Sequence, residues 1–158
     1  MPAMISHTPP SMVREHEELH AALAHATRSG GRTAAAAADV ARLLHPHFIK
    51  EEAFALPPLG LLPALAGGRV DPAMAEVLAM TDRLAAEYEN MLAEHKTIVA
   101  ALEKLAAAAK DEAKPEAARF ATQLIAHARM EEEVSYPAAL LVGRYLKATL
   151  PRGKHKAA

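Results

Sequence analysis

The sequence contains no cysteine and no tryptophan, and aromatic residues make up only 4% of its 158 residues. Without cysteine the chain cannot form disulfides, iron–sulfur clusters or thiolate-ligated metal sites. Strands favour aromatic and β-branched side chains, so a chain rich in Ala and Leu instead favours helices. The length fits a single domain that can bury a hydrophobic core without cross-links.

Strong charge of either sign is also missing. The formal net charge is −1, so no basic field exists to attract nucleic acid or an anionic membrane surface. No uncharged apolar run reaches the roughly 18 residues of a membrane span. The first ten residues, MPAMISHTPP, have neither the basic nor the apolar region of a signal peptide. We therefore expect a cytoplasmic protein that binds neither nucleic acid nor membrane.

Turn and capping residues divide the chain into helices, with no candidate strand. Ser11 and Thr33 are expected to cap the first two helices, and Asp71 followed by Pro72 is expected to start the third. A third helix of about 39 residues would be about 58 Å long, so a break or bend is expected in it. The expected helices cover residues 11–27, 33–56, 71–109, 115–136 and 138–150.

Short connections favour antiparallel neighbours. The expected fold is therefore all-α, an up-down antiparallel four-helix bundle with a short extra C-terminal helix. Residues 11–150 would form this bundle, after a flexible N-terminal segment at residues 1–10 and before a disordered tail at residues 151–158. Residues 57–70, rich in Pro, Gly and Leu, would pack over one end of it.

A weak internal duplication falls on the histidines. EHEELHAAL at residues 15–23 aligns with EHKTIVAAL at residues 94–102, with five of nine positions identical. HFIKEE at residues 47–52 aligns with HARMEE at residues 127–132, and Pro57 aligns with Pro137. We infer that the first two helices resemble the next two, so that two half-sites related by a pseudo-two-fold axis would make one symmetric centre.

The duplicated segments contain two histidine–glutamate pairs with the same spacing. Glu51 stands four residues after His47, and Glu131 stands four residues after His127. On a helix this spacing places both side chains on one face, with Cβ atoms about 5–6 Å apart. Each pair can therefore bind the same ion.

Each of the other two helices carries a single histidine on its apolar stripe, His16 and His95, and such stripes face the core. Four buried imidazoles and two buried carboxylates without partners would be costly, whereas a pair of dications would turn them into ligands. Nitrogen and oxygen ligands without sulfur suit iron, manganese or zinc. With two carboxylates for two metals, we expect Glu51 and Glu131 to bridge them.

The order H…HxxxE…H…HxxxE, with the endings EEAFALPPL and EEEVSYPAAL, resembles the hemerythrin-like (HHE cation-binding) family. The resemblance extends from about Met12 to Tyr145. It implies a four-helix bundle with two non-haem iron ions bridged by carboxylates, which binds, senses or handles O2, NO or peroxide. By position, the metal ligands would be His16, His47, Glu51, His95, His127 and Glu131.

Two departures from the oxygen-carrying hemerythrins favour sensing, reactivity or iron handling over reversible oxygen carriage. The carriers have an HxxxH pair on the third helix, but here Val99 stands four residues after His95. Their last carboxylate is typically an Asp one residue further along than Glu131. We favour a binding or sensing protein over an enzyme. The alternatives are a peroxide-decomposing or nitric oxide-reducing enzyme, an iron storage or homeostasis protein, and a metal-free helical adapter.

Five other side chains stand close in sequence to the expected ligands. His20 could be a seventh ligand or contact one, but we interpret it as half-exposed, and His45 as pointing away. Tyr88 could approach the site, although packing is the simpler interpretation. Glu52 and Glu132 turn about 100° from the ligand face and are expected to be solvated or hydrogen-bonded to ligands.

Overall fold

The computed structural model describes residues 7–151, and these form helices and connecting turns without any strand. The expected tail therefore lies almost entirely outside the described residues, as does part of the expected N-terminal segment. The elements are α1 (Pro10–Thr27), α2 (Gly31–Lys50), η1 (Glu51–Ala55), η2 (Pro57–Leu61), α3 (Leu62–Ala66), η3 (Pro72–Val77), α4 (Leu78–Asp111), α5 (Pro115–Met130), η4 (Glu131–Ser135) and α6 (Tyr136–Thr149).

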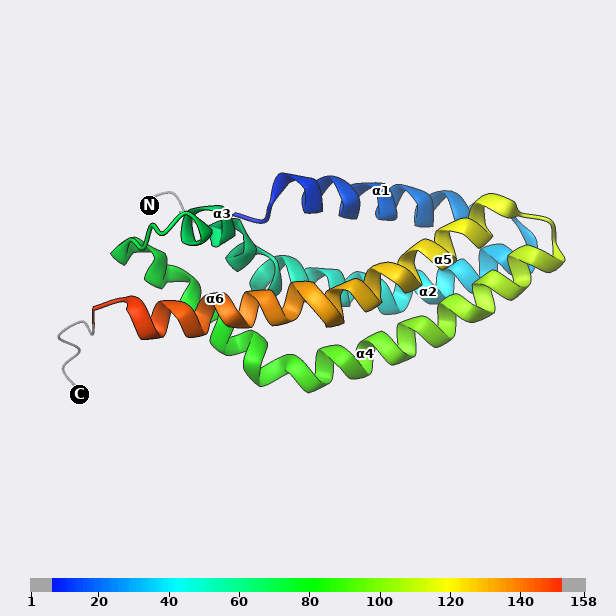
Figure 1. Ribbon diagram of the computed structural model, residues 1–158. Coiled ribbons are helices and arrows are strands. Elements are labelled where there is room, and N and C mark those ends of the chain that lie inside the picture. Colours follow the sequence, from blue (N-terminus) through cyan, green and yellow to red (C-terminus); the bar gives the residue numbers. More distant parts are fainter. Residues whose placement is uncertain (1–6, 152–158) are drawn as a thin grey trace.

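The long helices form a bundle in which α2 and α5 each pack against both α1 and α4. The turn between α1 and α2 and the turn between α4 and α5 lie at the same end of the molecule (Figure 1). The short helices η2 and α3 lie at the opposite end, where α6 also ends. Within residues 7–151, every helix is too short or too polar to cross a bilayer.

The first two helices start differently from the sequence expectation. α1 begins at Pro10 without any side-chain cap, so Ser11 is not its cap. α2 begins at Gly31, two residues before Thr33. Gly30 and Gly31 both have positive φ, 79° and 63°, a conformation that glycine adopts without the steric cost of a Cβ atom. The two glycines therefore let the chain reverse directly after α1.

Glu112, which directly follows α4, caps the start of the neighbouring helix α2. Its carboxylate accepts hydrogen bonds from the Thr33 hydroxyl (2.6 Å) and from the backbone N–H groups of Thr33 (2.7 Å) and Arg32 (3.1 Å). The Thr33 hydroxyl and these N–H groups favour the charged carboxylate and lower the pKa of Glu112 to about 2. This contact joins the turn between α1 and α2 to the turn between α4 and α5.

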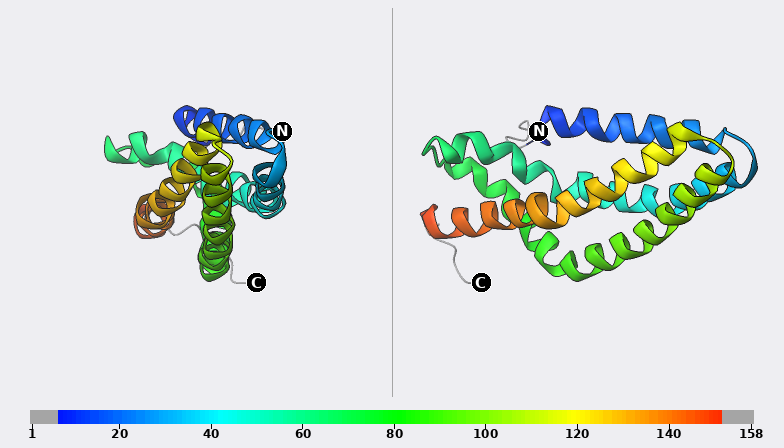
Figure 2. Two further views of the ribbon diagram at one scale, coloured as in Figure 1. Left: turned by 90° about the vertical axis from the view of Figure 1, so that its right-hand side faces the viewer. Right: turned by 45° about the vertical axis from the view of Figure 1, so that its right-hand side comes forward.

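The third expected helix changes type near its start. The Asp71 carboxylate accepts a hydrogen bond from the backbone N–H of Ala73 at 2.9 Å, as expected of a cap. The first turns, η3, are 3₁₀-helical, and α4 follows with 34 residues. α4 is visibly bent along its length in the right-hand view of Figure 2. The expected break is thus a change from 3₁₀ to α geometry at Leu78.

The second and fourth expected helices each contain a π-helical turn, η1 and η4. After η4 the chain continues directly into α6 at Tyr136 (Figure 1). The expected last helix, residues 138–150, corresponds to α6, which begins two residues earlier than expected. Pro137 lies in the first turn of α6, where a missing N–H removes no intrahelical bond. Single π turns of this kind are frequent at functional sites.

The core has an apolar region on each side of the expected ligands. Towards the α1–α2 turn lies the apolar end, a cluster that includes Leu44, Leu102 and Leu105. On the other side a second cluster includes Phe54, Met91 and Tyr136, among others. The ligand positions fall between these two clusters along each long helix.

Candidate metal centre

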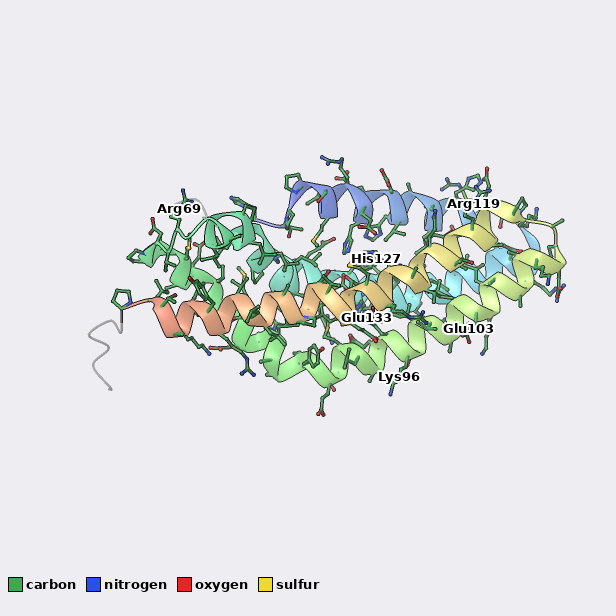
Figure 3. The ribbon with its side chains drawn as sticks, viewed as in Figure 1. Arg69, Lys96, Glu103, Arg119, His127 and Glu133 are labelled. Atoms are coloured by element: carbon green, nitrogen blue, oxygen red, sulfur yellow. The ribbon has the colours of Figure 1, made fainter. Side chains whose placement is uncertain are left out.

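The structure brings all six expected ligand side chains together in one buried layer, which we call the ligand layer. The histidines come from four different helices, α1, α2, α4 and α5, and the glutamates are the first residues of the π turns η1 and η4. Their exposed fractions lie between 0% for Glu51 and 8% for His127. In Figure 3, His127 points into the bundle whereas Lys96 and Glu103 point outward from α4.

The ligand layer contains two groups of four side chains, and the ligand atoms within each group lie within 4.8 Å of one another. The first group has His16 and His127, and the second has His47 and His95. Glu51 and Glu131 belong to both groups. Two carboxylates shared between two pairs of histidines are the arrangement that a bridged metal pair requires.

Each shared carboxylate turns one oxygen towards each group. Oε1 of Glu51 lies 2.6 Å from Nε2 of His47, and its Oε2 lies 3.3 Å from Nε2 of His16. Likewise, Oε1 of Glu131 lies 3.5 Å from Nε2 of His95, and its Oε2 lies 3.4 Å from Nε2 of His127. Both glutamates are therefore oriented to bind two ions with their two oxygens.

Four buried atoms of the ligand layer have no hydrogen-bond partner within residues 7–151. Buried polar atoms are normally paired, since an unpaired one loses its hydration without compensation. Cations between the ligands would supply the missing partners for three of these atoms, and the fourth, Nδ1 of His16, faces Glu52 instead. The donor set and these atoms together fit a metal pair. The four buried atoms without a hydrogen-bond partner are Nδ1 of His16, Oε2 of Glu51, Nε2 of His127 and Oε2 of Glu131.

Carboxylates and imidazoles in this layer stabilise one another's charged forms. Burial lowers the pKa of His95, but the carboxylates of Glu131 and Glu51 outweigh it and raise that pKa to about 10. Burial likewise lowers the pKa of His127, yet Glu131 raises it to about 9. Burial raises the pKa of Glu51, but the imidazole of His47 holds it below its usual range. Metal binding therefore competes with protons for His95 and His127.

A second carboxylate faces Nδ1 of each histidine, on the side away from the shared glutamates. Such a partner fixes the ring and leaves Nε2 to face a metal. The pairs are His47–Glu94 (2.9 Å), His95–Glu132 (3.0 Å), His127–Glu15 (2.7 Å) and His16–Glu52 (3.7 Å, beyond hydrogen-bond distance). The contacts of Glu52 and Glu132 agree with the sequence interpretation.

Sequence reasoning missed Glu15 and Glu94. A signal for them exists, because each stands directly before a single histidine at the same position of the duplicated segment, as the dipeptide EH. Each contacts the histidine of a neighbouring helix rather than its own neighbour in sequence. Glu94 also accepts a hydrogen bond from Lys50 at 2.7 Å, which helps to fix its carboxylate.

The other histidines and tyrosines near the layer behave in different ways. His20 is half-buried and its ring packs edge-on against Phe48, with centroids 4.8 Å apart, and His45 is exposed. Neither belongs to the two groups. Tyr88 packs edge-on against Tyr136, with ring centroids 6.4 Å apart. These placements agree with the packing and surface interpretations.

Tyr136 is a residue of the ligand layer that the sequence analysis did not single out. It is fully buried, and its hydroxyl donates a hydrogen bond to Oε1 of Glu51 at 2.7 Å. Burial and the charge of Glu51 raise the pKa of this hydroxyl, so it stays protonated in the absence of a cation. Its only signal in the sequence is its place directly before Pro137, at the end of the duplicated segment.

Comparison with known proteins agrees with this geometry. The family model described as Hemerythrin HHE cation binding domain matches residues 7–139. A search of curated proteins found no match, and a search of solved structures found none. The matched range includes the whole ligand layer. This chain therefore belongs to the hemerythrin HHE cation-binding domain family.

Proposed function

We propose that the protein binds two non-haem iron ions in the ligand layer, bridged by Glu51 and Glu131, and uses them to bind, sense or handle O2 or a related small molecule such as NO or peroxide. One observation carries the proposal, namely that the two ligand groups share both glutamates and that each glutamate turns one oxygen to each group. The nitrogen and oxygen donor set also suits manganese or zinc, and the family membership favours iron.

The iron pair would supply a binding position for the small molecule and a source of electrons. The chain's own residues hold and orient the site. Glu15, Glu94 and Glu132 fix three of the four imidazoles through Nδ1. The burial of the six ligand side chains excludes bulk water, which strengthens every electrostatic interaction in the layer.

The proposal includes the up-down antiparallel order of the four long helices and a bundle over residues 11–150. The position of both helix-joining turns at one end supports this order (Figure 1). The pairwise packing of α1 and α4 against both α2 and α5 supports it as well. In that order, each helix brings one histidine to the same level.

Metal content after expression with iron tests the proposal. The variant pair Glu51→Ala with Glu131→Ala removes both shared carboxylates. Glu17→Ala with Glu133→Ala is the matched control, since it removes the same charge from two exposed positions. We expect two iron ions per chain in the wild type and in the control, and almost none in the first variant.

Folding must be separated from metal binding in this experiment. Circular dichroism would show whether the alanine variant stays helical, and Glu51→Gln with Glu131→Gln removes the charge while keeping the shape. A wild-type chain with less than half a metal ion, unchanged in both variant pairs, would refute the bridged pair.

A further inference from the structure

The hydroxyl oxygen of Tyr136 stands at ligand distance from one of the two groups. It lies 2.7 Å from Oε1 of Glu51, 3.2 Å from Nε2 of His47 and 3.1 Å from Nε2 of His95. All three atoms belong to the second group. In octahedral coordination with bonds of about 2.1 Å, adjacent ligand atoms are about 3.0 Å apart. The oxygen of Tyr136 is therefore placed as one more ligand of the same ion.

The position of Tyr136 is fixed by its surroundings. Its ring stacks on that of His95, with centroids 5.4 Å apart and planes 27° from parallel. It belongs to the second apolar cluster, together with Phe54, Leu84 and Met91. As the first residue of α6, it directly follows the π turn that carries Glu131. The hydroxyl is thus held in place by packing as well as by its hydrogen bond.

Among residues 7–151, no tyrosine hydroxyl occupies the corresponding position beside the first group. In the duplicated sequence, Leu56 aligns with Tyr136 directly before the matching proline. Leu56 is buried and lines a cavity of about 350 Å³ beside His16, together with the half-buried Met12. Three of the four unpaired buried atoms are ligand atoms of the first group, namely Oε2 of Glu51, Nε2 of His127 and Oε2 of Glu131.

We propose that Tyr136 is a direct ligand of the metal held by His47 and His95, and that a small external ligand binds the metal held by His16 and His127. This inference rests on the proposed function, because it presupposes the metal pair. On binding a ferric ion the phenol releases its proton to solvent and its oxygen becomes a phenolate ligand, with no transfer of electrons.

The pseudo-two-fold relation indicates where the external ligand enters. Cavities border both groups, two of them beside the first group at His16 and His127 and one beside His95, so access alone does not distinguish the groups. The position on the first metal that corresponds to the oxygen of Tyr136 lies towards Leu56. Because Leu56 offers no donor atom, that position is left to a molecule that enters through the cavity beside Met12.

The first test is the visible and resonance Raman spectrum of the ferric protein. We expect a tyrosinate-to-iron charge-transfer band with phenolate modes in the wild type, lost in Tyr136→Phe while both irons remain bound. Tyr88→Phe is the matched control and should keep the band, since Tyr88 makes its ring contact with Tyr136 and none with the ligands. The sequence has three tyrosines in all, so the assignment is simple.

The outcomes separate this inference from the function on which it rests. A wild-type protein with two irons but no tyrosinate band would overturn the inference alone, as would a band that survives in Tyr136→Phe. A wild-type protein that binds no metal pair would overturn both. The wild-type spectrum decides the point even when the variant does not fold.

The second test is azide binding to the ferric protein. Met12→Trp fills the cavity beside His16 and should weaken azide binding about tenfold or more. Val99→Trp places the same side chain at a half-buried position in the cavity beside His95 and should leave it unchanged. Leu56→Tyr should also block azide and add a second tyrosinate signal. Azide binding that is weakened by Val99→Trp and not by Met12→Trp would place the external ligand on the other metal.

Discussion

Along α4, His95 of the ligand layer is followed within one turn by Ile98, and then by Leu102 and Leu105 of the apolar end. The two regions are equally well buried, with Leu102 at 0% and His95 at 2% exposure. Burial stabilises the leucines by removing apolar surface from water. The same burial costs free energy for the imidazoles and carboxylates, unless protons or metal ions compensate for it.

The apolar end therefore contributes to the stability of the bundle, whereas the ligand layer serves the proposed metal binding. The apolar end is stabilised by the burial of its hydrophobic side chains, which requires no ligand. The ligand layer depends on what is bound in it, and its stability therefore changes with metal and pH. Perturbations of the two regions should therefore have distinguishable effects on stability and on metal content.

Removal of iron by a chelator should produce the largest effect. At free iron about 1,000-fold above the Kd, each site contributes about 4 kcal/mol to the free energy of unfolding. At about 2–4 °C per kcal/mol, loss of both sites should lower the Tm by roughly 15–30 °C. Circular dichroism melts with and without chelator measure this. An unchanged Tm would show that protons alone compensate the buried ligand layer.

Leu102→Ala should destabilise the protein without changing its metal content. Truncation of a buried leucine leaves a cavity and costs about 2–5 kcal/mol, and Leu102 is fully buried in the apolar end. Urea unfolding and elemental analysis of the same sample measure the two effects. Lys104→Ala, at an exposed neighbouring position, is the control. Loss of iron from folded Leu102→Ala would mean that the two regions are not separable.

Glu94→Gln should weaken metal binding while leaving the six ligand side chains in place. Glu94 accepts from Nδ1 of His47 and from Lys50, and loss of such a partner typically costs 10–100-fold in metal affinity. Competition with a chelator of known affinity measures the change. Glu103→Gln changes an exposed glutamate on the same helix and should have no effect. Equal affinities for both variants would refute the role of Glu94.

Glu112→Gln should have the smallest effect, restricted to the far end of the bundle. The pKa of Glu112 is lowered to about 2 in the folded state, below its value of about 4.5 in the unfolded chain. The carboxylate therefore stabilises the fold above pH 4.5, and this contribution is lost as the pH falls towards 2. We expect a Tm a few degrees below wild type at pH 7, converging with wild type in acid. A difference that grows in acid would contradict this.

The sequence predicted the helical fold and the position of the ligand layer because the evidence for both is local or repeated. Apolar periodicity marks helices, and the duplication showed which histidines and glutamates belong together. The structure does bring His16, His47, Glu51, His95, His127 and Glu131 into one layer. Their role as iron ligands stays a prediction that the metal analysis tests.

What sequence reasoning missed depends on contacts between distant residues. Thr33 was expected to cap its own helix, but its hydroxyl binds Glu112, which is 79 residues away. Tyr136 enters the ligand layer because the π turn before it continues into α6, and neither π turn leaves a pattern of apolar residues that differs clearly from an α-helix. Comparing the two halves of the duplication would have drawn attention to Tyr136, because the aligned residue in the first half is Leu56.

The two π turns also determine how the fold responds to a mutation that deletes one residue. A π turn holds one residue more than an α turn does, so the loss of one codon from residues 131–135 would leave a regular α-helix. One α turn covers nearly the same rotation as the π turn with its extra residue, so everything after it would keep its orientation and Tyr136 would stay beside Glu51. In the first half, the chain changes to 3₁₀ geometry directly after its π turn, so that connection could absorb the same loss.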